Sequence, residues 1–122
     1  MKTILVAEDD HFLSNAYRIK LVKLGFDVKI VSDGEQVLQY LHEQGAPNLL
    51  LLDLIMPVKD GFDTLREIKA NDKLKKFPII VASNLGEAED VKKAKELGAV
   101  DYIVKSDLSL QELAEKINSY LA

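Results

Sequence analysis

The chain has 122 residues, of which 48% are hydrophobic, so it is long enough to bury the core of one domain over residues 1–122 and too apolar to be disordered. Its net charge of −4 argues against a surface for nucleic acid or anionic membrane, and its lack of cysteine excludes disulfides and thiolate metal sites. The apolar runs are too short for a signal peptide or a membrane span, so we expect a cytoplasmic protein without membrane contact.

Short apolar runs alternate with amphipathic segments along the whole chain. The runs predict five strands, at residues 4–7, 28–31, 49–52, 79–82 and 102–104. Between and after them, apolar residues recur three and four positions apart, which predicts five helices. The first helix is expected to bury one apolar stripe, made by Phe12, Ala16 and Ile19 and widened by Leu13, Tyr17 and Leu24.

Capping residues mark where several helices begin and end. Gly25 stands where a left-handed cap belongs after the first helix. Capping boxes precede the second and fifth helices, and an aspartate precedes the third, at Ser32–Glu35, Ser109–Glu112 and Asp60.

The fourth helix has the thinnest apolar face of the five. It is expected from about Glu87 to Leu97, with only Ala88, Val91, Ala94 and Leu97 pointing inward. Because so few apolar contacts hold it, we expect this helix to be attached loosely.

The alternation of five strands with five helices predicts an α/β domain. Crossovers of this length are right-handed, which gives a parallel sheet with helices on both faces. At this size we expect the flavodoxin-like, doubly wound strand order 2-1-3-4-5. Ligands of such sheets bind beyond the carboxyl ends of the strands, so the residues that follow each apolar run indicate the site.

Asp53 directly follows four leucines that are typical of a strand buried on both faces. An ionised carboxylate in apolar surroundings is costly unless charge or hydrogen bonds compensate it. The first, fourth and fifth strands are followed by acids, a hydroxyl and an ammonium, namely Glu8-Asp9-Asp10, Ser83 and Lys105. We expect these groups to converge with Asp53 at one edge of the sheet.

Converging carboxylates repel one another unless a cation lies among them. An incomplete set of oxygen ligands suits Mg²⁺, which keeps several waters and accepts a phosphate oxygen. Lys105 adds a fixed point charge for a phosphoryl oxygen. A carboxylate, a hard cation, a lysine and a hydroxyl are together the groups needed to form an aspartyl phosphate.

Four motifs carry a family resemblance: E-D-D after the first strand, L-D-L-I-M-P after the third, A-S after the fourth and D-Y-I-V-K at the fifth. In this order they resemble the receiver domain of two-component response regulators, over the whole chain. The resemblance implies that Asp53 accepts a phosphoryl group, with Lys105 and Ser83 as the other catalytic residues. It also implies that Ser83 and Tyr102 act as the switch residues.

The resemblance further implies a Mg²⁺ cofactor. Its protein ligands would be Glu8, Asp9, Asp53 and the backbone carbonyl of Ile55. Ile55 and Leu85, which lie two positions beyond the acceptor aspartate and the switch serine, would modulate the rate of dephosphorylation.

The implied partners are a histidine kinase or histidine phosphotransferase as donor and a downstream protein as target. The fourth helix, fifth strand and fifth helix would form the output face. With no output domain in the sequence, the chain resembles the single-domain class, typified by the chemotaxis regulator. A second interpretation, that it was cut from a longer regulator after Ala122, stays open. Such a domain catalyses only its own phosphorylation and dephosphorylation, so it is not expected to be an enzyme for other substrates.

Three features depart from the family pattern. Ser106 stands where a proline usually follows the lysine, Asn84 stands where a small alanine is commoner, and both rate-modulating positions, Ile55 and Leu85, are apolar. The proline is typically preceded by a cis bond. For a serine the cis form costs about 2.5–4 kcal/mol, so we expect a trans bond between Lys105 and Ser106 with a rearranged loop.

Structural roles compete with several of these assignments. Asp10 is expected to cap the first helix. Asp53 and Lys105 by themselves would make a structural ion pair, although the acidic pair argues against so simple a role. Ser83 with Asn84 would also serve as a cap for the fourth helix, and Tyr102 as a packing residue. The two histidines have no ligand spacing and are expected at the surface, at His11 and His42.

Three other functions are weighed against phosphoryl transfer. An aspartate-nucleophile phosphatase also uses an aspartate after a strand, but it needs a second acid where this chain has Ile55. A receiver-like module that binds partners without phosphorylation normally lacks the acids or the lysine. A flavin-binding protein of the same fold needs a phosphate-binding loop where this chain has three acids.

Overall fold

The structure is a computed structural model that describes residues 1–74 and 76–121; the predicted domain end at Ala122 lies outside the described residues. The strands are β1 (Thr3–Ala7), β2 (Asp27–Val31), β3 (Leu49–Leu52), β4 (Ile79–Ser83) and β5 (Asp101–Val104). The helices are α1 (His11–Lys23), α2 (Gly34–Gln44), α3 (Gly61–Ala70), α4 (Ala88–Glu96) and α5 (Leu110–Leu121), with a 3₁₀ turn, η1 (Lys105–Asp107), between β5 and α5.

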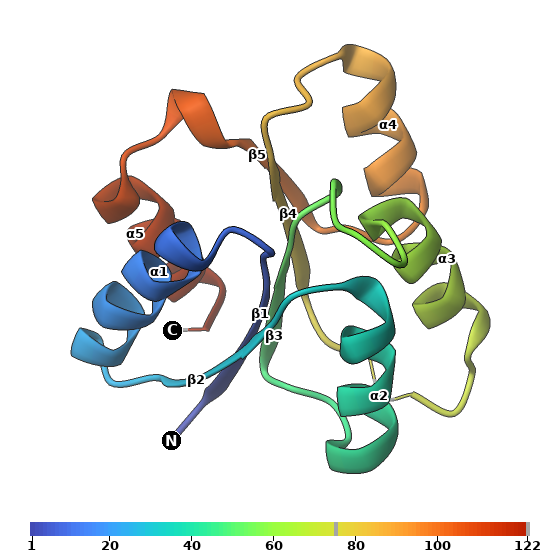
Figure 1. Cartoon of the computed structure of the whole chain (residues 1–122), viewed down its shortest axis with the longest axis horizontal. Helices are drawn as coiled ribbons and strands as arrows, with labels where there is room; N and C mark the ends of the chain where they lie inside the picture. Colours follow the sequence, from blue (N-terminus) through green and yellow to red (C-terminus); the bar gives the residue numbers. More distant parts are fainter. Residues whose placement is uncertain (75, 122) are drawn as a thin grey trace.

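All five strands run parallel in the order β2-β1-β3-β4-β5, as the sequence predicts. Figure 1 shows the sheet in the centre, with α1 and α5 on one face and α2, α3 and α4 on the other. This is the flavodoxin-like doubly wound arrangement. Among the helices in the described part of the chain, none is long and apolar enough to cross a membrane.

The central strand β3 joins the two halves of the core. Leu49 and Leu51 pack into the cluster under α1 and α5, whereas Leu50 and Leu52 pack into the cluster under α2, α3 and α4. All four side chains are 2% exposed or less. Each fully buried leucine contributes about 1.5–3 kcal/mol relative to an exposed one, so β3 is a firmly fixed support for whatever follows it.

Four strands extend one residue beyond their apolar runs, into polar residues. The added residues are Thr3, Asp27, Ser83 and Asp101. Their backbones pair in register with the neighbouring strand, as Asp27 does with Thr3 and Asp101 with Ile80. Backbone hydrogen bonding, rather than apolar character, therefore decides where these strands begin and end.

The face that helix α1 turns to the core overlaps only in part with the predicted stripe, since Leu13 and Tyr17 pack there and Ala16 is half-buried. Its buried residues are Ser14, Tyr17 and Leu21, of which only Tyr17 belongs to the predicted stripe. Three predicted core residues are exposed by 43% or more: Phe12, Ile19 and Leu24. Apolar side chains are spread around much of α1, so periodicity does not select one face. Packing against α5 and β2 makes that selection.

Most of the predicted caps are confirmed. Asp10 and Asp60 accept hydrogen bonds from the backbone N–H groups of the first turns of α1 and α3. The Ser109–Glu112 box forms in both directions, at 3.1 Å each. Gly25 follows α1 with a φ of 93°, which is the left-handed conformation expected of a terminal glycine.

The predicted capping box at Ser32 is wrong by one residue. Asp33 is the N-cap of α2, and its carboxylate accepts from the Gln36 N–H at 2.9 Å. The Ser32 N–H instead donates to the Gln36 side chain at 2.9 Å. The sequence holds two overlapping sets of capping residues, and an aspartate is at least as good an N-cap as a serine.

Helix α4 is thinly packed, as predicted, but its details differ. Only Ala94 is buried along the helix, Val91 is half-buried, and the predicted core residue Ala88 is exposed. The prediction that Ser83 and Asn84 cap this helix is wrong, because the helix begins only at Ala88 and its N-cap makes no side-chain hydrogen bond. Helix α4 is therefore held by few apolar contacts and by no side-chain N-cap.

Candidate functional site

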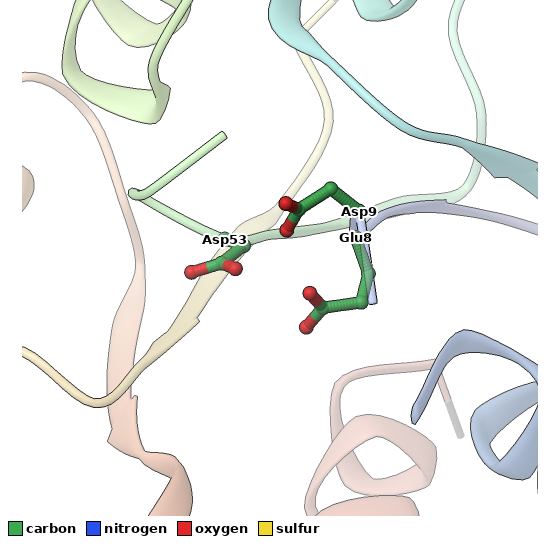
Figure 2. A group of neighbouring side chains, drawn as sticks. All are labelled: Glu8, Asp9 and Asp53. Carbon is green, nitrogen blue, oxygen red and sulfur yellow. The ribbon is translucent and has the colours of Figure 1, made fainter. Parts of the chain in front are cut away.

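Three carboxylates converge at the carboxyl end of the sheet. Glu8 and Asp9 follow β1 directly and Asp53 follows β3, and Figure 2 shows their carboxyl groups gathered around one space. Each offers one oxygen within 4.8 Å of the other two. Glu8 and Asp53 are 2% and 7% exposed, whereas Asp9 is exposed. The sequence predicted this convergence because β1 and β3 are adjacent parallel strands.

Lys105 follows β5 and reaches both buried acids. Its Nζ lies 3.1 Å from Asp53 Oδ2 and donates a short hydrogen bond to Glu8 Oε1. Burial by itself lowers the pKa of Lys105, but the hydrogen bond to Glu8 and the charge of Asp53 outweigh it, so the pKa is raised. The sequence suggests the ion pair of Lys105 with Asp53 but does not indicate the pair with Glu8.

Burial also has the largest effect on the pKa of the Glu8 carboxyl. It raises the pKa of Glu8, the hydrogen bond from Lys105 partly offsets that effect, and the charge of Asp53 adds to it. The cluster has three carboxylates, and the Lys105 ammonium contacts two of them, Glu8 and Asp53, so the cluster carries excess negative charge. Such a set of oxygen ligands, with Asp9 open to solvent, fits a hard divalent cation such as Mg²⁺.

Ser83 and Tyr102 are linked through the backbone of Leu85. The Ser83 hydroxyl is buried at the end of β4 and accepts from the Leu85 N–H at 3.3 Å. The Tyr102 hydroxyl donates to the Leu85 carbonyl. Burial, together with the charge of Asp90, raises the pKa of Tyr102. A displacement of Ser83 would therefore disturb the segment that holds Tyr102.

The two apolar positions near the site differ in exposure. The Ile55 side chain is 59% exposed, and its N–H donates to Asp53 Oδ1 at 3.3 Å. Leu85 is half-buried. The role of the Ile55 carbonyl as a metal ligand, and of both side chains in setting a rate, stay predictions.

The remaining polar residues near the site have structural positions. Asp10 caps α1, and its N–H donates to Glu8 Oε2 at 3.2 Å, which helps to orient that carboxylate. His11 and His42 are exposed, as predicted. No cis peptide bond occurs in residues 1–74 and 76–121, so the bond between Lys105 and Ser106 is trans, and both residues lie in η1.

The loop before α3 contains a strained residue that the sequence does not indicate. Val58 has a φ of 67°, in the left-handed region, and is 81% exposed. The Lys59 N–H donates to the Pro57 carbonyl at 2.7 Å and closes a tight turn around it. The Lys59 ammonium is paired with Glu35 of α2 at 2.9 Å and with Glu67 of α3. Because these contacts fix the turn, Val58 keeps a conformation that β-branched residues disfavour.

The comparison with known families agrees with this geometry. A family model described as the response regulator receiver domain matches residues 4–118. The chain belongs to this family. It is therefore placed among the phosphoacceptor signalling domains of two-component systems, which are signalling domains rather than conventional enzymes.

Curated relatives and solved structures are also similar to this receiver domain. The transcriptional regulatory protein CpxR of Klebsiella pneumoniae is 36% identical over 121 residues, which are 99% of this chain and 50% of that protein. The Mn²⁺-bound form of response regulator Rcp1 is 32% identical, with a TM-score of 0.86 over 99% of this chain and 94% of that one. The phosphorylated cyanobacterial phytochrome response regulator RcpA is 30% identical, with a TM-score of 0.83 over 97% and 89%. This receiver domain spans about half the length of the curated relatives it matches.

The strain at Val58 predicts an unusual stabilising substitution. Val58→Gly should raise the free energy of unfolding by about 1 kcal/mol, because glycine removes a strain of about 1–3 kcal/mol and loses part of it to chain entropy. The measurement is urea denaturation of the metal-free protein. Val100→Gly is the matched control, since Val100 is also exposed but lacks a positive φ, and it should lower stability by about 0.5–1 kcal/mol. A Val58→Gly protein no more stable than wild type would contradict the prediction.

Proposed function

We propose that this receiver domain takes a phosphoryl group from a histidine kinase or histidine phosphotransferase onto Asp53. The observation that carries the proposal is the cluster at the end of the sheet. Asp53 is buried beside Glu8 and Asp9, and the Lys105 Nζ, which also contacts Glu8, lies 3.1 Å from Asp53 Oδ2. These are the groups that an aspartyl phosphate requires. The acceptor is the buried carboxylate and not the exposed Asp9, which is left to bind metal.

In the proposed reaction an oxygen of Asp53 forms a bond to phosphorus while the bond from phosphorus to the donor's histidine nitrogen breaks. The imidazole leaves with the electron pair of that bond. Lys105 attracts the phosphoryl oxygens and gives up part of its contact with Glu8. Mg²⁺, when bound, would neutralise phosphoryl charge, and its ligands would be Glu8, Asp9, Asp53 and the Ile55 carbonyl.

The same residues connect the reaction to an output face. The Ser83 hydroxyl moves to donate to a phosphoryl oxygen, and this movement weakens the hydrogen bond that it now accepts from the Leu85 N–H at 3.3 Å. The Leu85 carbonyl accepts from the Tyr102 hydroxyl, so a movement of the Leu85 backbone alters the hydrogen bond that positions the tyrosine. The loosely packed α4 then shifts its equilibrium position. A downstream protein would read α4, β5 and α5.

Intact-mass measurement tests the proposal most directly. With Mg²⁺ and either acetyl phosphate or phosphoramidate, the wild type should gain one phosphoryl group, and Asp53→Asn should gain none. Asp63→Asn, an exposed carboxylate of α3, is the matched control and should react like wild type. Donor turnover without a covalent adduct would favour the phosphatase. No adduct and no turnover would leave only the binding module.

Mg²⁺ should stabilise the fold, because it relieves repulsion among Glu8, Asp9 and Asp53. For a site of millimolar affinity, a tenfold excess of free metal adds about 1.4 kcal/mol to the free energy of unfolding. Asp53→Asn should stabilise the metal-free protein and weaken the response to Mg²⁺, since it removes one charge. Thermal denaturation over a Mg²⁺ series makes the measurement. A melting temperature that does not change with low-millimolar Mg²⁺ would disprove the metal assignment.

The phosphorylated form should lose its phosphoryl group slowly. Water must approach in line from the side opposite Asp53, and the apolar Ile55 and Leu85 cannot orient it. Losing one positioned water contact raises the barrier by about 1–2 kcal/mol, or roughly five- to thirtyfold in rate. We therefore expect Ile55→Asn and Leu85→Glu to decay faster than wild type, measured in excess Mg²⁺ after removal of the donor. Equal or slower decay in both variants would remove the argument.

A further inference from the structure

Two polar contacts join α3 to the thinly packed α4. The Lys93 ammonium of α4 lies over the Phe62 ring of α3, 4.2 Å from its centroid. Near the end of α4, the Lys69 ammonium of α3 donates to the Glu96 carbonyl at 2.7 Å. Ala94 is the one buried residue within α4. The position of α4 therefore depends on contacts made by exposed lysines as well as on its packing against β5.

The partner helix α3, in contrast, is fixed to the phosphoacceptor segment. The N–H of Gly61, its first residue, donates to the Leu54 carbonyl at 2.9 Å. A Cβ at Gly61 would lie 2.4 Å from the Asp53 carbonyl oxygen, so the helix start and the acceptor backbone are in direct contact. Phe62 is the next residue along α3. The Phe62 ring thus belongs to α3, which is fixed to the Asp53 backbone, whereas Lys93 belongs to the thinly packed α4.

A contact between a fixed helix and a loose one stabilises a single relative position of the two. A cation over an aromatic ring at an exposed site changes an equilibrium constant by about two- to fivefold. If a shift of α4 accompanies phosphorylation, the contact is lost or weakened in the shifted state. By linkage, a contact made only in the unshifted state weakens binding at Asp53 by up to the same factor, and by the full factor when the unshifted state predominates in the free protein.

We propose that the Phe62–Lys93 contact is a latch that holds α4 in its unphosphorylated position and so opposes occupancy of the Asp53 site. The proposal rests on the function proposed above and adds to it the element that sets the resting equilibrium. Lys93 touches neither the acids nor Lys105, so its effect on the site is carried through the position of α4.

Beryllofluoride with Mg²⁺, as a non-covalent stand-in for the phosphoryl group, measures the effect without a protein donor. Phe62→Leu keeps an apolar side chain and removes the π face, and Lys93→Gln keeps the stem and removes the charge. Both should bind beryllofluoride about two- to fivefold more tightly than wild type in calorimetric titration. Lys95→Gln is the matched control, since it removes a charge from the same last turn of α4, and it should bind like wild type.

Hydrogen exchange in the metal-free protein provides the second readout. Amides of α4 should exchange faster in both variants, with α1 and α5 unchanged, and the double variant should not exceed the larger single effect, because both substitutions remove one contact. Unchanged or weaker beryllofluoride binding in both variants would overturn the latch. A wild type that binds no beryllofluoride would overturn the proposed function instead. In that case, unchanged exchange of the α4 amides in the two variants would overturn the latch. Faster exchange would support the Phe62–Lys93 contact as one that holds α4 in position.

Discussion

The charge imbalance at the carboxyl end of the sheet is the constraint on which the rest of the structure depends. Glu8 and Asp53 are buried beside Asp9, and within the described chain Lys105 is the cation that contacts both buried acids. Excess negative charge in a low-dielectric interior is costly, and one ammonium balances only part of it. The site therefore favours the binding of a cation, and the proposed function adds a phosphoryl group that contacts Lys105.

Holding these groups together requires a rigid frame. The leucines of β3 are buried on both faces, and Asp53 is attached directly to their carboxyl end. The close approach of Gly61 to the Asp53 carbonyl fixes the start of α3 against the same strand. The turn at Val58 is strained, yet it persists because Lys59 is paired with acids of α2 and α3. Firm packing on this side keeps the Asp53 carboxylate in position.

The other side of the site is built differently. Helix α4 buries one alanine, begins without a side-chain cap, and meets α3 through the Lys93–Phe62 contact. The Leu85 backbone, which precedes it, is shared by Ser83 and Tyr102. A domain that signals by changing shape needs such a weakly held element next to a rigid one, because a small binding energy can then shift the equilibrium between two positions.

The sequence by itself determined the strands and helices and the polar residues that meet at one edge of the sheet, because these follow from local pattern. The strand order followed from the rule for α/β domains of this size. Apolar runs separated by amphipathic segments give parallel strands, and the residues that follow the runs must lie at one edge, which brings Asp9, Asp53 and Lys105 together. Only the tertiary structure decided which face of α1 is buried, that Lys105 also pairs with Glu8, and that Val58 is left-handed. Each of these depends on contacts between segments far apart in the chain. Hydrophobic periodicity does not encode such contacts, since several arrangements satisfy the same pattern until packing and charge select one.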